Sequence, residues 1–201
     1  DVMARHQRVC RYLDMPFQHA SAAVLRRMRR WGSAREYKEL IGRARTLMPR
    51  LSLRSTFIVG FPGERDEDFE ELLDFVVETE FDHAGAFLFS PEEGTEAATL
   101  TPRIPFRTAQ RRLSVLSAAL LDAAEARLRA RVGESVEVLV DAAATDDAPS
   151  GVVAVGRTEG QAPEVDGVTY LLGKRGDAYA VGEVVRGRVV ETVGYDLLAE
   201  P

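Results

Sequence analysis

Residues 51–63 read LSLRSTFIVGFPG, an apolar and β-branched run that ends in a glycine-rich turn. The run predicts a strand over residues 51–59. Its last part, Phe57-Ile58-Val59, is apolar on both faces, which is typical of a parallel strand covered on both sides. The turn at 60–63 is followed by a predicted helix with acidic residues in its first turn, which suits the helix dipole. The stretch therefore predicts a strand–turn–helix unit of a parallel sheet.

Similar units lie on either side of this stretch. Residues 12–17 and 84–89 read as short buried strands. One helix is predicted from Ser21 to Arg30, and another begins at the capping box formed by Ser33 and Glu36. Strands that alternate with helices indicate a parallel α/β sheet. Since three such strands leave open edges, we expect further strands of the sheet upstream of this segment.

The pattern changes after a long helix predicted between Pro105 and Gly133. About five short strands follow, each bounded by glycine, proline or aspartate, with no helical stretch between them. A flexible hairpin loop is expected at residues 142–150. This part reads as a small all-β barrel. We therefore expect two domains, residues 1–130 and residues 131–201.

Composition excludes several protein classes. The chain is 45% hydrophobic and 29% charged, which is ordinary for a globular protein. No apolar run approaches the ~18 residues that a membrane span needs. The single cysteine, Cys10, excludes a disulfide scaffold and a cysteine-only metal site built from this chain, so no metal ligands are predicted. One thiol suits a reducing compartment, and we expect a cytoplasmic protein.

The net charge of −6 is divided unevenly along the chain. Residues 1–130 carry a net charge of +1, whereas residues 131–201 carry −7. An acidic module repels a phosphate backbone and attracts basic partners. The alternative is that these acids only keep the module in solution.

Candidate ligand-binding residues follow the predicted strands, because ligands of parallel sheets bind at strand ends. Gln18 offers an amide, and Gly60 in the glycine turn permits close backbone approach. Ile58 and Phe89 supply apolar surface near the same edge. An amide, glycine turns and apolar edges suit a nucleoside-like ligand.

Other residues at these strand ends have simpler interpretations. His19 fits a capping or packing histidine better than a catalytic one, and Glu92 and Glu93 fit a solvated rim. The arginines between 26 and 30 could contact phosphate or RNA, but a solvated face is favoured. Neither a phosphate loop with lysine nor a Ser-His-Asp set is present, so no catalytic residue is assigned.

Three ordered motifs, YLDMPFQHAS at 12–21, RSTFIVGFPGE at 54–64 and FSPEEGT at 89–95, resemble the radical S-adenosylmethionine methylthiotransferases. The stretches QAPEVDG at 161–167 and YDLL at 195–198 resemble the TRAM domain of one branch. That branch methylthiolates an aspartate of small-subunit ribosomal protein twelve. The resemblance implies a transferase in which this segment is the C-terminal part of a partial parallel, TIM-like (β/α) barrel that holds S-adenosylmethionine across its strand ends. Gln18 would lie near the ribose or methionyl part, and Ile58, Gly60 and Phe89 near the adenine.

The resemblance also implies two 4Fe-4S clusters. The family holds its radical-generating cluster on a C-x-x-x-C-x-x-C loop and the second on three further cysteines. Cys10 lies in neither context. We therefore expect the cluster ligands to lie outside this chain, and the segment alone to be inactive.

Two alternatives to the ribosomal-protein branch stay open. One is the sister branch that modifies tRNA adenosines, and the other is a non-catalytic binding adapter. The acidity of residues 131–201 favours a basic ribosomal protein over tRNA. No membrane partner is expected, because the chain has no apolar run long enough to span a bilayer. Substrate contacts are expected at Glu164, Asp166 and Asp196, in turns of the acidic module.

Overall fold

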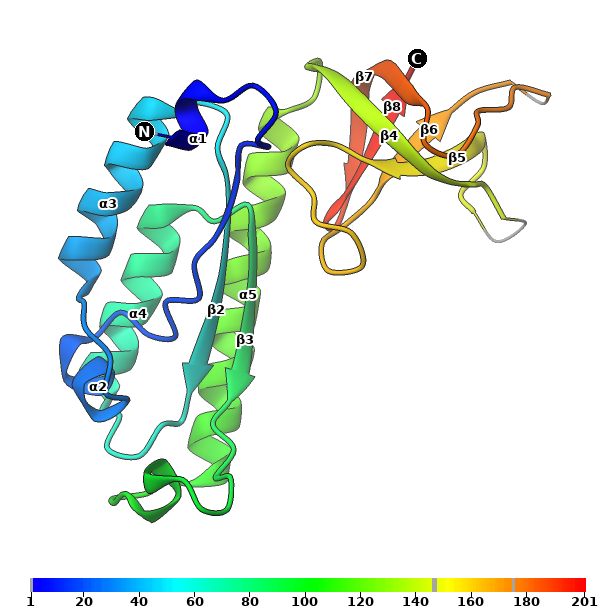
Figure 1. The fold of residues 1–201 in the computed structure, drawn as a ribbon. Helices are drawn as coiled ribbons and strands as arrows, with labels where there is room; N and C mark the ends of the chain where they lie inside the picture. Colours follow the sequence, from blue (N-terminus) through cyan, green and yellow to red (C-terminus); the bar gives the residue numbers. More distant parts are fainter. Residues whose placement is uncertain (1, 146–147, 175) are drawn as a thin grey trace. The chain divides into compact units, whose positions relative to one another are not determined.

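The computed structural model describes residues 2–145, 148–174 and 176–201. It separates into two compact units, one formed by Leu13–Ala123 and the other by Asp1–Tyr12 with Ala124–Pro201 (Figure 1). The expected flexible loop at 142–150 includes Asp146 and Asp147, which lie outside the described residues.

A three-stranded sheet forms the centre of the first unit. Its strands are β1 (Tyr12–Asp14), β2 (Ser52–Val59) and β3 (His83–Leu88), in the spatial order β1-β2-β3. β2 and β3 are parallel, with Arg54 opposite His83 and Val59 opposite Leu88. Beyond β1 the chain still follows β2, since Gln18 forms a parallel bridge with Phe57. The prediction of a parallel α/β sheet is confirmed.

The helices are α2 (Ala22–Arg27), α3 (Ala34–Leu47), α4 (Asp66–Thr79) and α5 (Phe106–Ala130), with a 3-10 turn at Glu96–Thr99 and the short α1 (Val2–Arg5) of the second unit. Two of them, α2 and α3, begin at the serine caps that the sequence predicts. The Ser21 hydroxyl oxygen accepts from the Ala23 amide at 3.3 Å, and that of Ser33 from the Glu36 amide at 3.3 Å. α2 ends at Arg27 rather than Arg30, and Arg29 adopts a φ of 56°.

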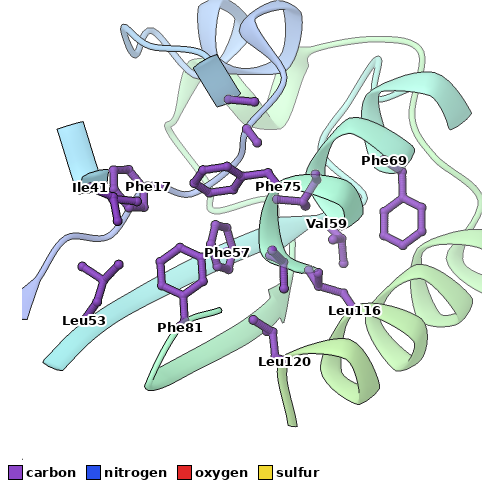
Figure 2. Close-up of a cluster of buried hydrophobic side chains, with 14 residues drawn as sticks. Phe17, Ile41, Leu53, Phe57, Val59, Phe69, Phe75, Phe81, Leu116 and Leu120 are labelled. Atoms are coloured by element: carbon purple, nitrogen blue, oxygen red, sulfur yellow. The ribbon is translucent and has the colours of Figure 1, made fainter. Parts of the chain in front are cut away.

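The core of the first unit lies on one face of the sheet (Figure 2). Phe57 of β2 packs edge-on against Phe81 and Phe75, with ring centroids 5.4 and 6.3 Å apart. α3 contributes Ile41 and α5 contributes Leu116 to the same buried cluster. The helices therefore cover the face of β2 that carries its odd-numbered residues.

The opposite face of the sheet differs from the prediction of a strand covered on both sides. Ile58 and Thr56 are only half-buried, and Phe87 on β3 is 59% exposed. In the part of the chain that the structure describes, no helix contributes to a core on this face. Apolar residues on a strand do not reveal whether a helix or a ligand pocket faces them, because both environments favour apolar side chains.

The second unit contains a closed five-stranded barrel in the order β4-β5-β6-β8-β7. Its core includes Val138, Leu171 and Leu197, and Leu128 from the end of α5. The predicted small all-β barrel is confirmed. Its strands are β4 (Ser135–Ala143), β5 (Val152–Arg157), β6 (Thr169–Leu172), β7 (Val184–Val193) and β8 (Asp196–Glu200).

Among the described residues, no helix combines the length and the apolar character that crossing a membrane requires.

Candidate functional site: a pocket at the strand ends

A pocket of about 500 Å³ opens at the carboxyl ends of β2 and β3, on the face that the helices leave uncovered. Its volume lies in the range of small-molecule sites. Apolar surface comes from Ile58, Phe61 and Phe89, and neutral polar groups come from Gln18 and Ser90. The charged residues of its lining are Arg27, Arg29, Arg30 and Glu96. The pocket therefore combines the two kinds of surface that a nucleoside presents.

The structure brings together three of the four predicted cofactor residues. Gln18, Ile58 and Phe89 line the pocket, whereas Gly60 lines an adjoining apolar hollow of about 190 Å³ that shares Phe89. Gln18 has a φ of 70°, and its backbone is held against β2. The backbone amide of Gln18 donates to the Thr56 carbonyl at 2.9 Å, and its backbone carbonyl accepts from the Ile58 amide at 2.7 Å.

The two glycines of the turn have packing roles. Gly60 and Gly63 adopt φ values of 76° and 82°, which side chains rarely allow. A Cβ at Gly60 would lie 2.6 Å from the Cβ of Ala109 on α5, and one at Gly63 would lie 2.5 Å from the Arg27 guanidinium. The turn is thus seated closely against α5 and α2.

Of the arginines between 26 and 30, Arg26, Arg29 and Arg30 are exposed, as a solvated face requires, whereas Arg27 is half-buried. Arg27 donates from Nε to the Pro62 carbonyl at 2.7 Å and from Nη2 to the Thr101 carbonyl at 2.6 Å. Arg29 forms an exposed ion pair with Glu96. Arg27 therefore ties two segments beside the pocket to α2, through carbonyl partners that sequence spacing does not reveal.

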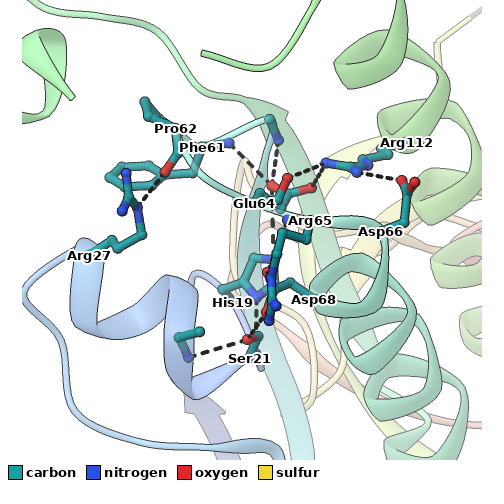
Figure 3. A network of polar contacts seen from close by, with 12 residues as sticks. His19, Ser21, Arg27, Phe61, Pro62, Glu64, Arg65, Asp66, Asp68 and Arg112 are labelled. Atoms are coloured by element: carbon teal, nitrogen blue, oxygen red, sulfur yellow. Dashed lines mark hydrogen bonds and ion pairs between the residues drawn. The ribbon is translucent and has the colours of Figure 1, made fainter. Parts of the chain in front are cut away.

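A buried polar network behind the turn was not predicted (Figure 3). Oε2 of Glu64 accepts from the amides of Gly60 at 2.7 Å and Phe61 at 3.2 Å. Oε1 of Glu64 accepts from Nη1 of Arg112 at 2.8 Å, and Nη2 of Arg112 donates to Asp66 at 2.6 Å. Burial raises the pKa of Glu64, while Arg112 and the two amides act in the opposite direction. Both residues stand in charged stretches of sequence that resemble surface, so no local signal marks them.

His19 is fully buried beside this network. Its Nδ1 accepts from the Ser21 amide at 3.0 Å, and its Nε2 lies 4.0 Å from Oε2 of Glu64. Desolvation by burial lowers the pKa of His19 to about 4, against the attraction of Asp68 and with the repulsion of Arg112. The imidazole is therefore neutral at pH 7, which agrees with its interpretation as a packing and capping residue.

Comparison with known proteins gives matches over both units. The profile of the radical SAM superfamily matches residues 1–76, and that of the TRAM domain matches residues 132–201. A protein of Delftia acidovorans named ribosomal protein uS12 methylthiotransferase RimO is 41% identical over 196 residues. Proteins of the same name from Acidothermus cellulolyticus and Salinispora tropica are 43% and 44% identical, over 201 and 198 residues.

Over almost its whole length the chain is similar to the RimO proteins, and its two parts match the radical SAM superfamily and the TRAM domain. The three matches cover 96%, 100% and 96% of this chain, but only 41%, 41% and 38% of the relatives. The chain thus spans about two fifths of the length of the curated RimO relatives that it matches.

The three acids expected to contact the substrate lie in the part that matches the TRAM domain, and their environments differ. Oδ2 of Asp166 accepts from the Tyr12 hydroxyl at 2.7 Å and the Ala162 amide at 2.8 Å. Oδ1 of Asp196 accepts from the Val168 amide at 2.7 Å. Glu164 is exposed, with a φ of 64°. Asp166 and Asp196 therefore hold backbone in place, and Glu164 is the acid that the turn presents to solvent.

The described residues do not fit an iron–sulfur cluster. The only cysteine, Cys10, is exposed. Within the described ranges, no three histidine, cysteine or acidic side chains are grouped so that they could hold a metal ion. Cluster binding by three thiolates therefore has no counterpart in these residues.

Proposed function

We propose that this chain is part of a radical SAM methylthiotransferase that adds a methylthio group to an aspartate of ribosomal protein uS12. The observation that carries the proposal is the convergence of Gln18, Ile58 and Phe89 on one pocket, in a chain 41–44% identical to proteins named for that reaction. A ribosomal substrate would place the enzyme in the cytoplasm.

The pocket fits the adenosine part of S-adenosylmethionine. Ile58 and Phe89 offer apolar surface for an adenine ring, and Gln18 and Ser90 offer neutral hydrogen-bonding groups for ribose. Gly60 borders the adjoining hollow through the backbone of the same turn. These residues would bind and orient the nucleoside.

Bound to a 4Fe-4S cluster, S-adenosylmethionine would supply the radical that activates an unreactive C–H bond. This chain would hold the nucleoside and exclude water from its apolar side. In the full-length protein we expect two clusters, with ligands outside this chain, because Cys10 is its only cysteine. We therefore expect the segment by itself to be inactive.

The acidic TRAM domain supports a basic protein as the substrate rather than tRNA. Residues 131–201 carry a net charge of −7, which repels a phosphate backbone. Glu164 is the proposed contact residue. A role for Asp166 and Asp196 in binding the substrate would be indirect, through the shape of the loops that they hold.

The nucleoside site can be tested in the chain itself with S-adenosylhomocysteine as the probe. We expect Ile58→Ala to weaken binding about tenfold, because the substitution removes apolar surface from the pocket. Val77→Ala is the matched control, since Val77 is an exposed residue of α4. Equal affinities of the wild type and Ile58→Ala in a calorimetric or NMR titration would refute the site.

The substrate is tested with the full-length enzyme, both as wild type and with Ile58→Ala. Mass spectrometry of uS12 and nucleoside analysis of tRNA then report which molecule gains the methylthio group. Modification of tRNA alone would contradict the proposed substrate.

A further inference from the structure

A buried arginine of α5, Arg112, connects that helix to the turn at residues 60–64. Arg112 is 3% exposed. Its Nη1 reaches both Oε1 and the backbone carbonyl of Glu64, at 2.8 and 3.2 Å. Its guanidinium also lies over the Phe69 ring of α4, 5.6 Å from the centroid. Arg112 therefore contacts the end of the turn and the start of the following helix together.

The two oxygens of the Glu64 carboxylate have different partners, one on α5 and the other in the turn. Oε1 faces Arg112, while Oε2 accepts from the amides of Gly60 and Phe61. Phe61 lines the pocket, and its ring packs edge-on against that of Phe89 with centroids 4.9 Å apart. One carboxylate thus contacts both α5 and the backbone that carries Phe61, and Figure 3 shows the dashed contacts of Glu64 with Phe61 and Arg112.

We propose that Arg112 is a positioning residue for the nucleoside pocket, acting through Glu64 on the amides of Gly60 and Phe61. The effect of Arg112 on a bound nucleoside rests on the proposed function, whereas its contacts with Glu64 do not. Arg112 does not line the pocket, so its effect on a ligand must pass through the turn.

The physical reason is the cost of an unpaired buried charge. Without Arg112, a carboxylate buried behind the turn loses its cation and is destabilised. Protonation of Glu64 relieves that cost, but a neutral carboxyl is a weaker acceptor than a carboxylate. The two amides then lose their strong partner, and the turn is free to shift Phe61.

The first measurement is amide hydrogen exchange in the full chain by NMR. Arg112→Met keeps the apolar length of the side chain and removes its charge. We expect exchange at Gly60 and Phe61 to accelerate about tenfold more than at the interior amides of β2, because charge-assisted bonds are lost. Arg112→Lys should restore part of the protection, and Arg111→Met, an exposed neighbour on the same helix, should behave as wild type.

The second measurement is the affinity for S-adenosylhomocysteine. We expect Arg112→Met and Glu64→Gln to weaken binding by similar factors, and the double variant to be no weaker than either single variant, because both act through one linkage. Additive losses would contradict a shared route.

Uniform acceleration of exchange across the first unit would show that Arg112 has only a general structural role, and would overturn the proposal. Unchanged protection at Gly60 and Phe61 would overturn it as well. If wild-type chain fails to bind S-adenosylhomocysteine, the proposed cofactor site is in question, while the exchange data still decide whether Arg112 positions the turn.

Discussion

At the scale of single residues, the buried polar groups behind the pocket are the feature that the sequence did not predict. His19 and Glu64 are fully or almost fully buried, and Nε2 of His19 lies 4.0 Å from Oε2 of Glu64. Burial disfavours the charged form of each, so it lowers the pKa of His19 and raises that of Glu64. The two groups consequently affect stability in opposite directions as the pH changes.

His19 is expected to make the protein less stable in mild acid. Its pKa is about 4 when folded and 6.5 when exposed, so the unfolded chain takes up the proton first as the pH falls below 6.5. The loss should reach about 2 kcal/mol at pH 5. Urea unfolding of wild type and His19→Gln at pH 7 and pH 5 measures it. The raised pKa of Glu64 acts with the opposite sign in both proteins, so the difference between them isolates His19. Identical pH dependence in the two proteins would show that His19 does not carry the effect.

At the scale of elements, the connection from β2 to α4 is shaped by close contact with α5. Gly60 has a φ of 76°, and its Cα faces Ala109 so closely that an added Cβ would lie 2.6 Å from the Ala109 Cβ. Gly94 has a similar φ of 79°, but an added Cβ there would have no neighbour within 4 Å. The two positions therefore separate backbone strain from contact with the helix.

Gly60→Ala should destabilise the protein more than Gly94→Ala. Both substitutions incur about 1 kcal/mol of strain from the positive φ, but only the first pushes the turn away from α5. We expect an additional loss of about 1–3 kcal/mol at Gly60. Chemical denaturation of the two variants measures the difference. A combined Gly60→Ala and Ala109→Gly variant should lose less than the sum of the single changes, and strict additivity would argue against the contact.

At the scale of the whole molecule, two properties of the chain stand out, the uneven distribution of its charge and its low cysteine content. The net charge of −7 is concentrated in residues 131–201, and Cys10 is the only thiol. These two properties lead to separate predictions, about partner binding and about cluster assembly.

Binding of the full chain to uS12 should weaken with salt, because exposed charges mainly steer association. Glu164→Lys should reduce the affinity at low salt by about 1 kcal/mol and flatten the salt dependence. Glu92→Lys, an exposed acid of the other unit, serves as the control. Titrations against uS12 and against tRNA at two salt concentrations provide the measurement. Tight binding to tRNA with none to uS12 would contradict the assignment.

Anaerobic reconstitution of the chain with iron and sulfide should yield no stoichiometric 4Fe-4S cluster. One cysteine cannot replace the three thiolates that such a cluster needs. Iron and sulfide analysis measures the outcome, with Cys10→Ser as the control for nonspecific metal. A full cluster that is lost in Cys10→Ser would refute the prediction.

The sequence alone was sufficient for the element order, the parallel sheet, the barrel and three residues of the pocket. Ser21 and Ser33 mark helix starts, and glycines mark the turns, because capping and turn formation depend on neighbours within a few residues. Gln18, Ile58 and Phe89 could be chosen because the ends of parallel strands meet at one edge of a sheet.

Only the tertiary structure decided which charged residues are buried and what they hold. Glu64 and Arg112 are 48 positions apart, and Arg27 reaches carbonyls 35 and 74 positions away. Asp166 and Asp196 look like surface acids in the sequence, yet their carboxylates accept hydrogen bonds from backbone amides. Burial and long-range pairing are properties of the packed chain. The residues next to a charged residue in the sequence do not show whether its side chain faces water or a buried partner.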